Sequence, residues 1–211
     1  MKYSVEQLKD TAKTIRCDIV EMVYLAGSGH PGGSLSAADI LSALYFNVMN
    51  IDPLDLRNPD RDLFVLSKGH AAPVLYSALA RRGYFSPDQL KHLRKVGAML
   101  QGHPDMKGTP GVEMSTGSLG QGLSAAVGMA LAKKIDKSPA RIYTLIGDGE
   151  INEGIIWEAT MAAAHYELDN LCAVLDFNGL QIDGPNEEVM GVSPIDDKFR
   201  SFGWHVITVD G

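Results

Sequence analysis

The chain has 211 residues, 45% of them hydrophobic and 21% charged, which suits one soluble α/β domain with a sizeable core. The formal net charge of -7 excludes a general nucleic-acid binder, which needs excess lysine and arginine, and the two cysteines exclude a disulfide framework or a thiolate metal site. Because neither a signal peptide nor a membrane-spanning run is visible, we expect a cytoplasmic protein.

The first half of the chain is predicted to be mainly helical. Ser4 to Gln7 have the form of a capping box, which opens a long amphipathic helix with apolar residues at steps of three and four. A glycine-rich stretch after residue 97 is too long for a simple connector, which favours a binding role. In chain order we predict helix 5–26, loop 27–33, helix 36–49, strand 62–66, helix 71–82, a helix opened by Ser86 and Pro87, and loop 97–117.

The second half alternates strands with helices. In chain order we predict helix 119–135, strand 141–146, helix 155–166, strand 171–177 and a last strand at 205–209. Continuously apolar strands joined by helices predict a parallel sheet with helices on both faces. The fold class is therefore α/β, with residues 1–211 in one domain.

The turn GDGEINEG at 147–154 carries three carboxylates, an amide and three glycines, more than a turn requires. Ligands of parallel sheets bind beyond the carboxyl ends of strands, where Asp148 and Asn178 are expected to converge. Both side chains supply the hard oxygens that Mg²⁺ takes alongside phosphate and water. Gly147 and Gly149 let the backbone approach a diphosphate, which the positive end of the next helix could face. Alternatively, GDG and NG are ordinary turns and Asp148 caps that helix.

Further motifs surround this turn. They are GSGHPGG at 27–33, LSKGHAAPVLY at 66–76, QGHPD at 101–105, STGSLGQGLSAAVGMA at 115–130 and FGWHVITVDG at 202–211. GDG and NG have the spacing of the thiamine-diphosphate motif, since 178 − 148 = 30. The set resembles the N-terminal, thiamine-diphosphate-binding part of transketolase, and is most similar to the separate N-terminal subunit of enzymes split into two chains. The likeness spans nearly the whole chain.

The resemblance implies a role for each matching residue. The implied Mg²⁺ ligands are Asp148, the side-chain oxygen of Asn178 and the main-chain carbonyl of Leu180. The implied thiamine diphosphate contacts, besides Asp148 and Asn178, are Gly117 and Leu119 at the thiazolium, Gly149 at the diphosphate, Glu153 as a nearby acid, and Ile182 packed on the cofactor. Glu150 receives no role beyond the turn. The residues implied to face the reacting sugar are His30, His70 and His103.

These three histidines are also unusual in their placement. Each follows a glycine in a predicted loop, whereas composition alone places about 0.6 of the six histidines after glycine, from 6 × 22/211. Imidazoles that titrate near neutrality can exchange protons with sugar hydroxyls. The remaining histidines, for which we expect helix-surface or packing positions, are His92, His165 and His205.

Two departures from the family pattern shape the expected assembly. Ser118 stands where many one-chain transketolases have proline, as in the split form. The glutamate that activates thiamine diphosphate belongs, in this family, to a separate pyrimidine-binding domain. That domain and the C-terminal domain are absent from 1–211, and the diphosphate-binding domain itself ends early by comparison with the family. We therefore expect a C-terminal, pyrimidine-binding partner subunit, sugar phosphate substrates, and a dimer or heterotetramer that is inactive without its partner.

Two other functions stay open on the sequence. One is another thiamine-dependent enzyme, such as a deoxyxylulose-phosphate synthase or a 2-oxo acid dehydrogenase subunit, although the GHPGG and QGHPD loops argue against it. The other is a non-catalytic module that binds Mg²⁺ and diphosphate or assists assembly. The missing glutamate and the early end of the chain favour that module.

Overall fold

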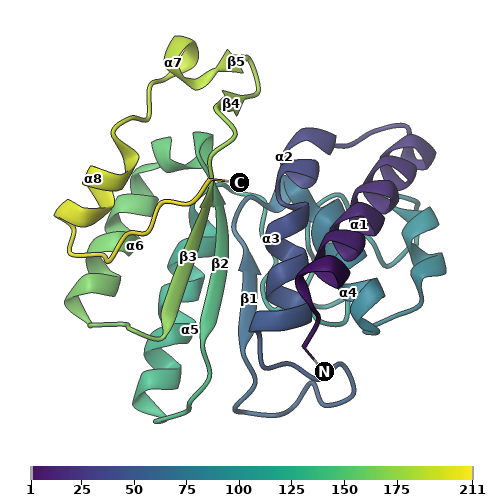
Figure 1. Ribbon diagram of the computed structural model, residues 1–211, viewed down its shortest axis with the longest axis horizontal. Coiled ribbons are helices and arrows are strands. Elements are labelled where there is room, and N and C mark those ends of the chain that lie inside the picture. The colour runs from purple at the N-terminus through teal and green to yellow at the C-terminus, as the bar shows by residue number, and fades with distance from the viewer. Residues whose placement is uncertain (1, 211) are drawn as a thin grey trace.

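A three-stranded parallel sheet forms the centre of the computed structural model, which describes residues 2–210 (Figure 1). Its strands are β1 (Leu63–Leu66), β2 (Ile142–Gly147) and β3 (Leu171–Asp176), in the spatial order β1-β2-β3. Leu63 pairs with Ile142, and Ile142 pairs with Leu171. The predicted β-α-β order and the parallel sheet are thereby confirmed.

Helices cover both faces of the sheet, as predicted. Successive residues of a strand point to opposite faces, and β2 divides its side chains accordingly. Tyr143 and Leu145 belong to one hydrophobic cluster, with residues of α1 to α4, whereas Ile142 and Ile146 belong to another, with residues of α5 and α6. A strand buried on both sides has to be apolar throughout, which is why the run at 142–146 contains no charge.

One layer of helices comes from the first half of the chain. Its elements are α1 (Val5–Ala26), α2 (Pro31–Ser36), α3 (Ala38–Ala43), the π-helical turn η1 (Leu44–Val48), the 3₁₀ turn η2 (Gly69–Ala71), α4 (Ala72–Arg82) and the 3₁₀ turn η3 (Pro87–His92). The predicted capping box is present: Gln7 N donates to Ser4 Oγ at 3.3 Å, and Ser4 N donates to Gln7 Oε1 at 2.9 Å. Gly27, with φ of 64°, ends α1.

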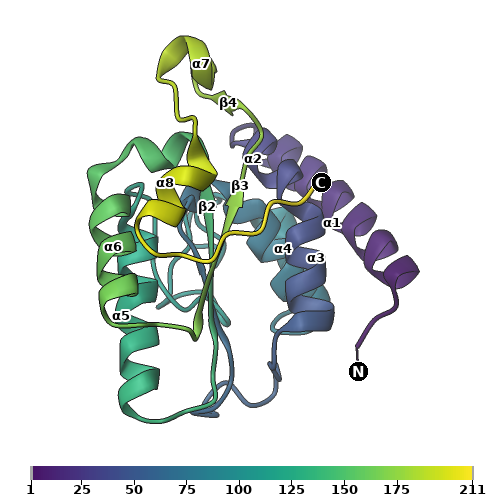
Figure 2. The ribbon, with the colours of Figure 1, turned by 60° about the vertical axis from the view of Figure 1, so that its left-hand side comes forward.

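The other layer comes from the second half. Its elements are α5 (Gln121–Ile135), the 3₁₀ turn η4 (Gly149–Asn152), α6 (Gly154–His165) and α8 (Ile195–Ser201). A small hairpin of β4 (Leu180–Gln181) and β5 (Gly184–Pro185), followed by α7 (Asn186–Val189), projects beyond the carboxyl ends of the strands (Figure 2). The sequence analysis predicted neither this hairpin nor α7 and α8.

Three predicted elements are wrong in detail. The helix expected at 36–49 is broken at Ala37, and its first piece, α2, begins at Pro31 inside the expected loop, because proline suits the first turn of a helix. Ser86 caps a segment of only six residues, and it forms a 3₁₀ turn, not an α-helix. Residues 205–209 form no strand. The chain there is held instead by packing on α6, since Trp204 Nε1 donates to Thr160 O at 2.9 Å.

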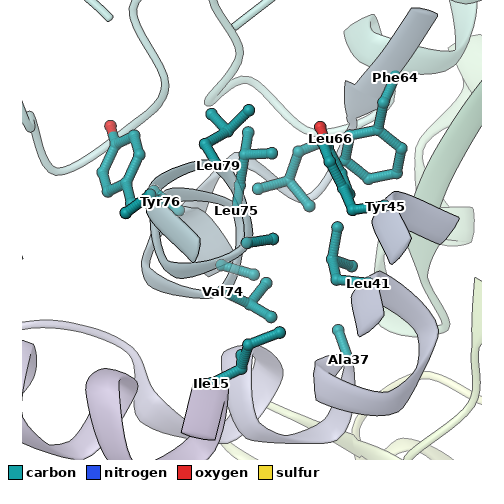
Figure 3. Packing of buried hydrophobic residues seen from close by; sticks show 14 of the residues in the cluster. Ile15, Ala37, Leu41, Tyr45, Phe64, Leu66, Val74, Leu75, Tyr76 and Leu79 are labelled. Atoms are coloured by element: carbon teal, nitrogen blue, oxygen red, sulfur yellow. The ribbon is translucent and has the colours of Figure 1, made fainter. Parts of the chain in front are cut away.

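The cluster on the first-half side is dense and continuous. Figure 3 shows α1, α3, α4 and β1 contributing to it, with Ile15, Leu41 and Leu79 fully buried at its centre. This core holds β1 in place, and β1 leads directly into a loop of the candidate site described below. Within residues 2–210, no helix is long and apolar enough to cross a membrane.

Replacing Leu41 with alanine should lower the free energy of unfolding by about 2–5 kcal/mol, because it leaves a cavity between α3 and the rest of the cluster. Urea titration of the purified protein measures this loss. Leu54→Ala is the matched control: Leu54 is 91% exposed, so its truncation should change stability by less than about 0.5 kcal/mol. Equal effects of the two substitutions would contradict this account of the core.

Candidate functional site

The candidate site lies where the three strands end. Ser67 and Lys68 follow β1, Asp148 follows β2, and Asp176 ends β3. Parallel strands bring their carboxyl ends to one edge, so residues far apart in sequence meet there. Asp148 N donates to Asp176 O at 3.2 Å, which joins the ends of β2 and β3 directly.

Asp148 is the centre of the predicted metal site. Its side chain is 2% exposed. Oδ1 accepts from Gly149 N at 2.9 Å, while Oδ2 accepts from Gly179 N at 2.7 Å and from Asn186 Nδ2 at 2.8 Å. Asp148 therefore both caps the η4 turn and binds the NG turn at 178–179. The structural alternative for GDG is real, but it leaves a buried carboxylate surrounded by neutral donors.

The other two predicted metal ligands lie on the hairpin side of Asp148. Asn178 is exposed, and its Oδ1 accepts from Leu180 N at 2.9 Å. Leu180 is 60% exposed and Ile182 is 97% exposed. The Gly179 N bond to Asp148 brings this turn to the carboxylate, whereas the side chain of Ile182 touches solvent.

The chemistry of these donors fits Mg²⁺. Residues 2–210 contain no cluster of three His, Cys, Asp or Glu side chains able to hold a metal, but the expected set needs only one carboxylate, an amide oxygen and a carbonyl. Such a set leaves coordination positions for phosphate and water. Asp148 also takes part in none of the ion pairs of the described chain. A buried carboxylate without a cation is a favourable place to add one.

The glycine loop at 117–120 lies against the histidine loops. A Cβ built on Gly117 would stand 3.2 Å from His103 Cδ2, and one built on Gly69 would stand 2.8 Å from Gly117 N. Gly120 has φ of 83°, and a Cβ on it would stand 3.2 Å from Glu153 Cβ. The structure thus brings Gly117 and His103 together and places exposed Glu153 beside the same loop, while Leu119 lies within it.

The three predicted sugar-site histidines form one group. The rings of His30 and His70 lie 5.5 Å apart at 76°. Burial, and then the positive charge of Lys68, lowers the pKa of His70 to about 4. Burial also lowers the pKa of His103, and nearby Arg94 lowers it further. His70 is therefore neutral at physiological pH and can both accept and donate a hydrogen bond. His92, His165 and His205 lie outside this group, on the other elements of the chain.

The buried lysine beneath the histidines was not predicted from the sequence. Lys68 is 2% exposed, and its Nζ donates to Asp176 Oδ2 at 2.6 Å and to Gly33 O at 2.9 Å. Asp176 Oδ1 accepts from Ser36 Oγ at 2.7 Å. This ion pair ties α2, the end of β3 and the loop after β1 together. The available signal was the lysine itself, since it directly follows an apolar strand that ends at a ligand-binding edge.

Glu150 has a larger part than the sequence analysis gave it. The side chain is 3% exposed. Its Oε1 accepts from Ser67 Oγ at 2.5 Å and Gly120 N at 2.8 Å, and its Oε2 accepts from Gly147 N at 3.0 Å. Burial raises the pKa of this carboxyl, while the three donors oppose the rise. Glu150 connects the loop after β1, the glycine loop and the end of β2.

Comparisons with known proteins agree with this arrangement. The family model described as "Transketolase, thiamine diphosphate binding domain" matches residues 7–211. A 6-deoxy-6-sulfo-D-fructose transketolase subunit from Clostridium sp. is 52% identical over 97% of this chain and 74% of its own length. One of the two apulose-4-phosphate transketolase relatives, the subunit from Phocaeicola vulgatus, is 45% identical over 98% of this chain and 73% of its own length. The transketolase structure from Leishmania mexicana superposes with a TM-score of 0.91 at 34% identity, covering 99% of this chain and 32% of that one.

The low pKa of His70 should make stability depend on pH. An unfolded histidine titrates near 6.5, so between pH 6.5 and about 4 the unfolded chain gains a proton that folded His70 does not. Stability is then complete above pH 6.5 and falls as the pH drops through this window. Between pH 7.5 and 5, wild type should lose roughly 1 kcal/mol more than His70→Gln, allowing for partial solvent screening. Identical losses in urea titrations would contradict the assignment.

Replacing Glu150 with glutamine should destabilise the protein by about 1–3 kcal/mol, because the amide nitrogen then faces a hydroxyl or main-chain donor. Chemical denaturation at pH 7 measures the loss. Glu158→Gln, at a position on the solvent side of α6, removes the same charge and should cost less than about 0.5 kcal/mol. If both variants unfold at the same denaturant concentration, Glu150 does not connect the three loops.

Proposed function

We propose a function that proceeds from one premise: this chain belongs to the transketolase family, as its thiamine diphosphate-binding domain. The chain binds thiamine diphosphate with Mg²⁺ and, together with a partner subunit, transfers a two-carbon ketol unit between sugar phosphates. The observation that supports this proposal is the meeting of buried Asp148, the glycine loop and three histidines at one edge of the sheet.

The chain's first task is to hold the cofactor. Asp148, the Asn178 side chain and the Leu180 carbonyl bind Mg²⁺, and Gly149 lets the main chain approach the diphosphate. Gly117 and Leu119 line the thiazolium, Ile182 packs on the cofactor, and Glu153 lies nearby as an acid. When bound, thiamine diphosphate supplies the carbanion stabilisation that ketol transfer requires.

The histidines act on the sugar. His30, His70 and His103 lie in loops that meet above the sheet, and burial keeps His70 neutral. A neutral imidazole can accept a proton from a sugar hydroxyl at one ring nitrogen and donate a hydrogen bond from the other. The Lys68–Asp176 pair fixes the loop that carries His70, and the Lys68 charge lowers the pKa of its ring.

A partner subunit completes the site. Two of the relatives are named as subunits of transketolases, and this chain spans 32% of the Leishmania mexicana enzyme. Large apolar side chains lie exposed around the hairpin: Phe177 at 58%, Leu180 at 60%, Ile182 at 97% and Met190 at 61%. The C-terminal, pyrimidine-binding subunit covers this surface and supplies the glutamate that activates the cofactor.

Reconstitution tests the complete activity. The chain is mixed with a pyrimidine-domain subunit from a split transketolase, thiamine diphosphate, Mg²⁺, a ketose phosphate and an aldose phosphate. We expect ketol transfer only when both subunits and both cofactors are present, because each subunit holds part of the site. Absence of turnover with every such subunit would contradict the proposed activity.

Asp148→Ala tests the cofactor site without turnover. Calorimetry should show that the variant loses Mg²⁺-dependent binding of thiamine diphosphate, by more than the roughly 10–100-fold that is typical for partners outside the coordination sphere. Circular dichroism should show that the fold is retained. Asp183→Ala, at an exposed carboxylate of the hairpin, is the control and should bind normally. Unchanged affinity of Asp148→Ala would refute the metal assignment.

A further inference from the structure

Asn186 connects Asp148 to the hairpin that carries the proposed metal ligands. It is the first residue of α7 and is 2% exposed. Its Nδ2 donates to Asp148 Oδ2 at 2.8 Å, and its main-chain N donates to Gly179 O at 2.9 Å. The residue therefore closes the loop 179–186 on itself and fixes that loop to the carboxylate. Neither the family motifs nor the sequence analysis singled it out.

The orientation of the Asn186 amide is fixed by chemistry. An ionised carboxylate can only accept hydrogen bonds, so the group facing Asp148 has to be the amide nitrogen. The amide oxygen then points away from the carboxylate. This Oδ1 is buried and has no hydrogen-bond donor among residues 2–210. Buried polar atoms in folded proteins nearly always have a partner, so this acceptor calls for an external donor.

The position of Oδ1 restricts what that donor is. A Cβ built on Gly149 would stand 3.8 Å from Asn186 Oδ1, so the oxygen lies beside the glycine that approaches the diphosphate. Phosphate oxygens are acceptors at neutral pH and cannot satisfy an amide oxygen. Water bound to Mg²⁺ is a strong donor, and Mg²⁺ in phosphate sites usually keeps some of its water.

We propose that Asn186 is a positioning residue for the metal: its Oδ1 accepts a hydrogen bond from a water bound to Mg²⁺, while its Nδ2 holds the Asp148 carboxylate. This inference rests on the proposed binding of Mg²⁺ and thiamine diphosphate. One side chain thus links the metal, its carboxylate ligand and the hairpin. Partners outside the coordination sphere orient metal ligands in this way and strengthen metal binding.

Asn186→Ala, compared with Asn170→Ala, tests the proposal. Asn170 has the same side chain, donates from Nδ2 to Ala130 O at 2.9 Å, and also has an unpaired buried Oδ1 within the described chain, but it lies just before β3, at the opposite edge of the sheet. Calorimetry measures thiamine diphosphate binding with Mg²⁺ and with EDTA. The ratio of the two affinities gives the gain due to the metal.

In Asn186→Ala the gain due to Mg²⁺ should fall roughly 10–100-fold, with little change in metal-free binding. Asn170→Ala should keep the wild-type gain. A loss of both metal-free and metal-dependent binding in Asn186→Ala would indicate a merely structural role and overturn the proposal, as would an unchanged gain. If wild type itself shows no Mg²⁺-dependent binding, the proposed function fails, and this inference fails with it.

A measurement on the wild-type protein covers the case in which Asn186→Ala does not fold. In ¹⁵N-edited NMR spectra of the thiamine diphosphate complex, adding Mg²⁺ should shift the side-chain NH₂ signals of Asn186 and leave those of Asn170 in place. Signals of Asn186 that ignore Mg²⁺ would overturn the proposal.

Discussion

Three loops at the carboxyl edge of the sheet meet at one buried carboxylate, that of Glu150. Hydrogen bonds from Ser67, Gly120 and Gly147 converge on its two oxygens, which fixes the loop after β1 and the glycine loop relative to the GDG turn. Burial of a carboxylate is unfavourable unless its oxygens are satisfied. The same requirement that makes Glu150 costly to bury therefore makes the relative placement of these loops specific.

A second buried charge organises the other side of the site. Lys68 and Asp176 pair between the end of β3 and the loop after β1, and Ser36 and the Gly33 carbonyl complete their hydrogen bonds. Buried ion pairs add little net stability, but they fix geometry when every donor and acceptor is satisfied. Here the positive charge also lies close enough to His70 to disfavour its protonation. Positioning and proton chemistry thus depend on the same side chain.

The glycines explain how closely these loops pack. A Cβ on Gly122 would stand 2.5 Å from Ser67 Cα, and one on Gly69 would stand 2.8 Å from Gly117 N. Side chains at either position would push apart the segments that Glu150 and Lys68 draw together. The glycine-rich composition of these loops is therefore a packing requirement as well as a means of approaching phosphate.

The sequence by itself determined the order of strands and helices, the parallel sheet and the edge at which the site lies, because apolar periodicity and cap residues are local signals. It also identified Asp148 and the histidines, whose motifs are contiguous. Only the tertiary structure decided the parts played by Glu150, Lys68 and Asn186, since each acts through partners distant along the chain. The same holds for the failed strand at 205–209: a strand exists only where a neighbour completes its hydrogen bonds, and packing of Trp204 on α6 holds this segment instead.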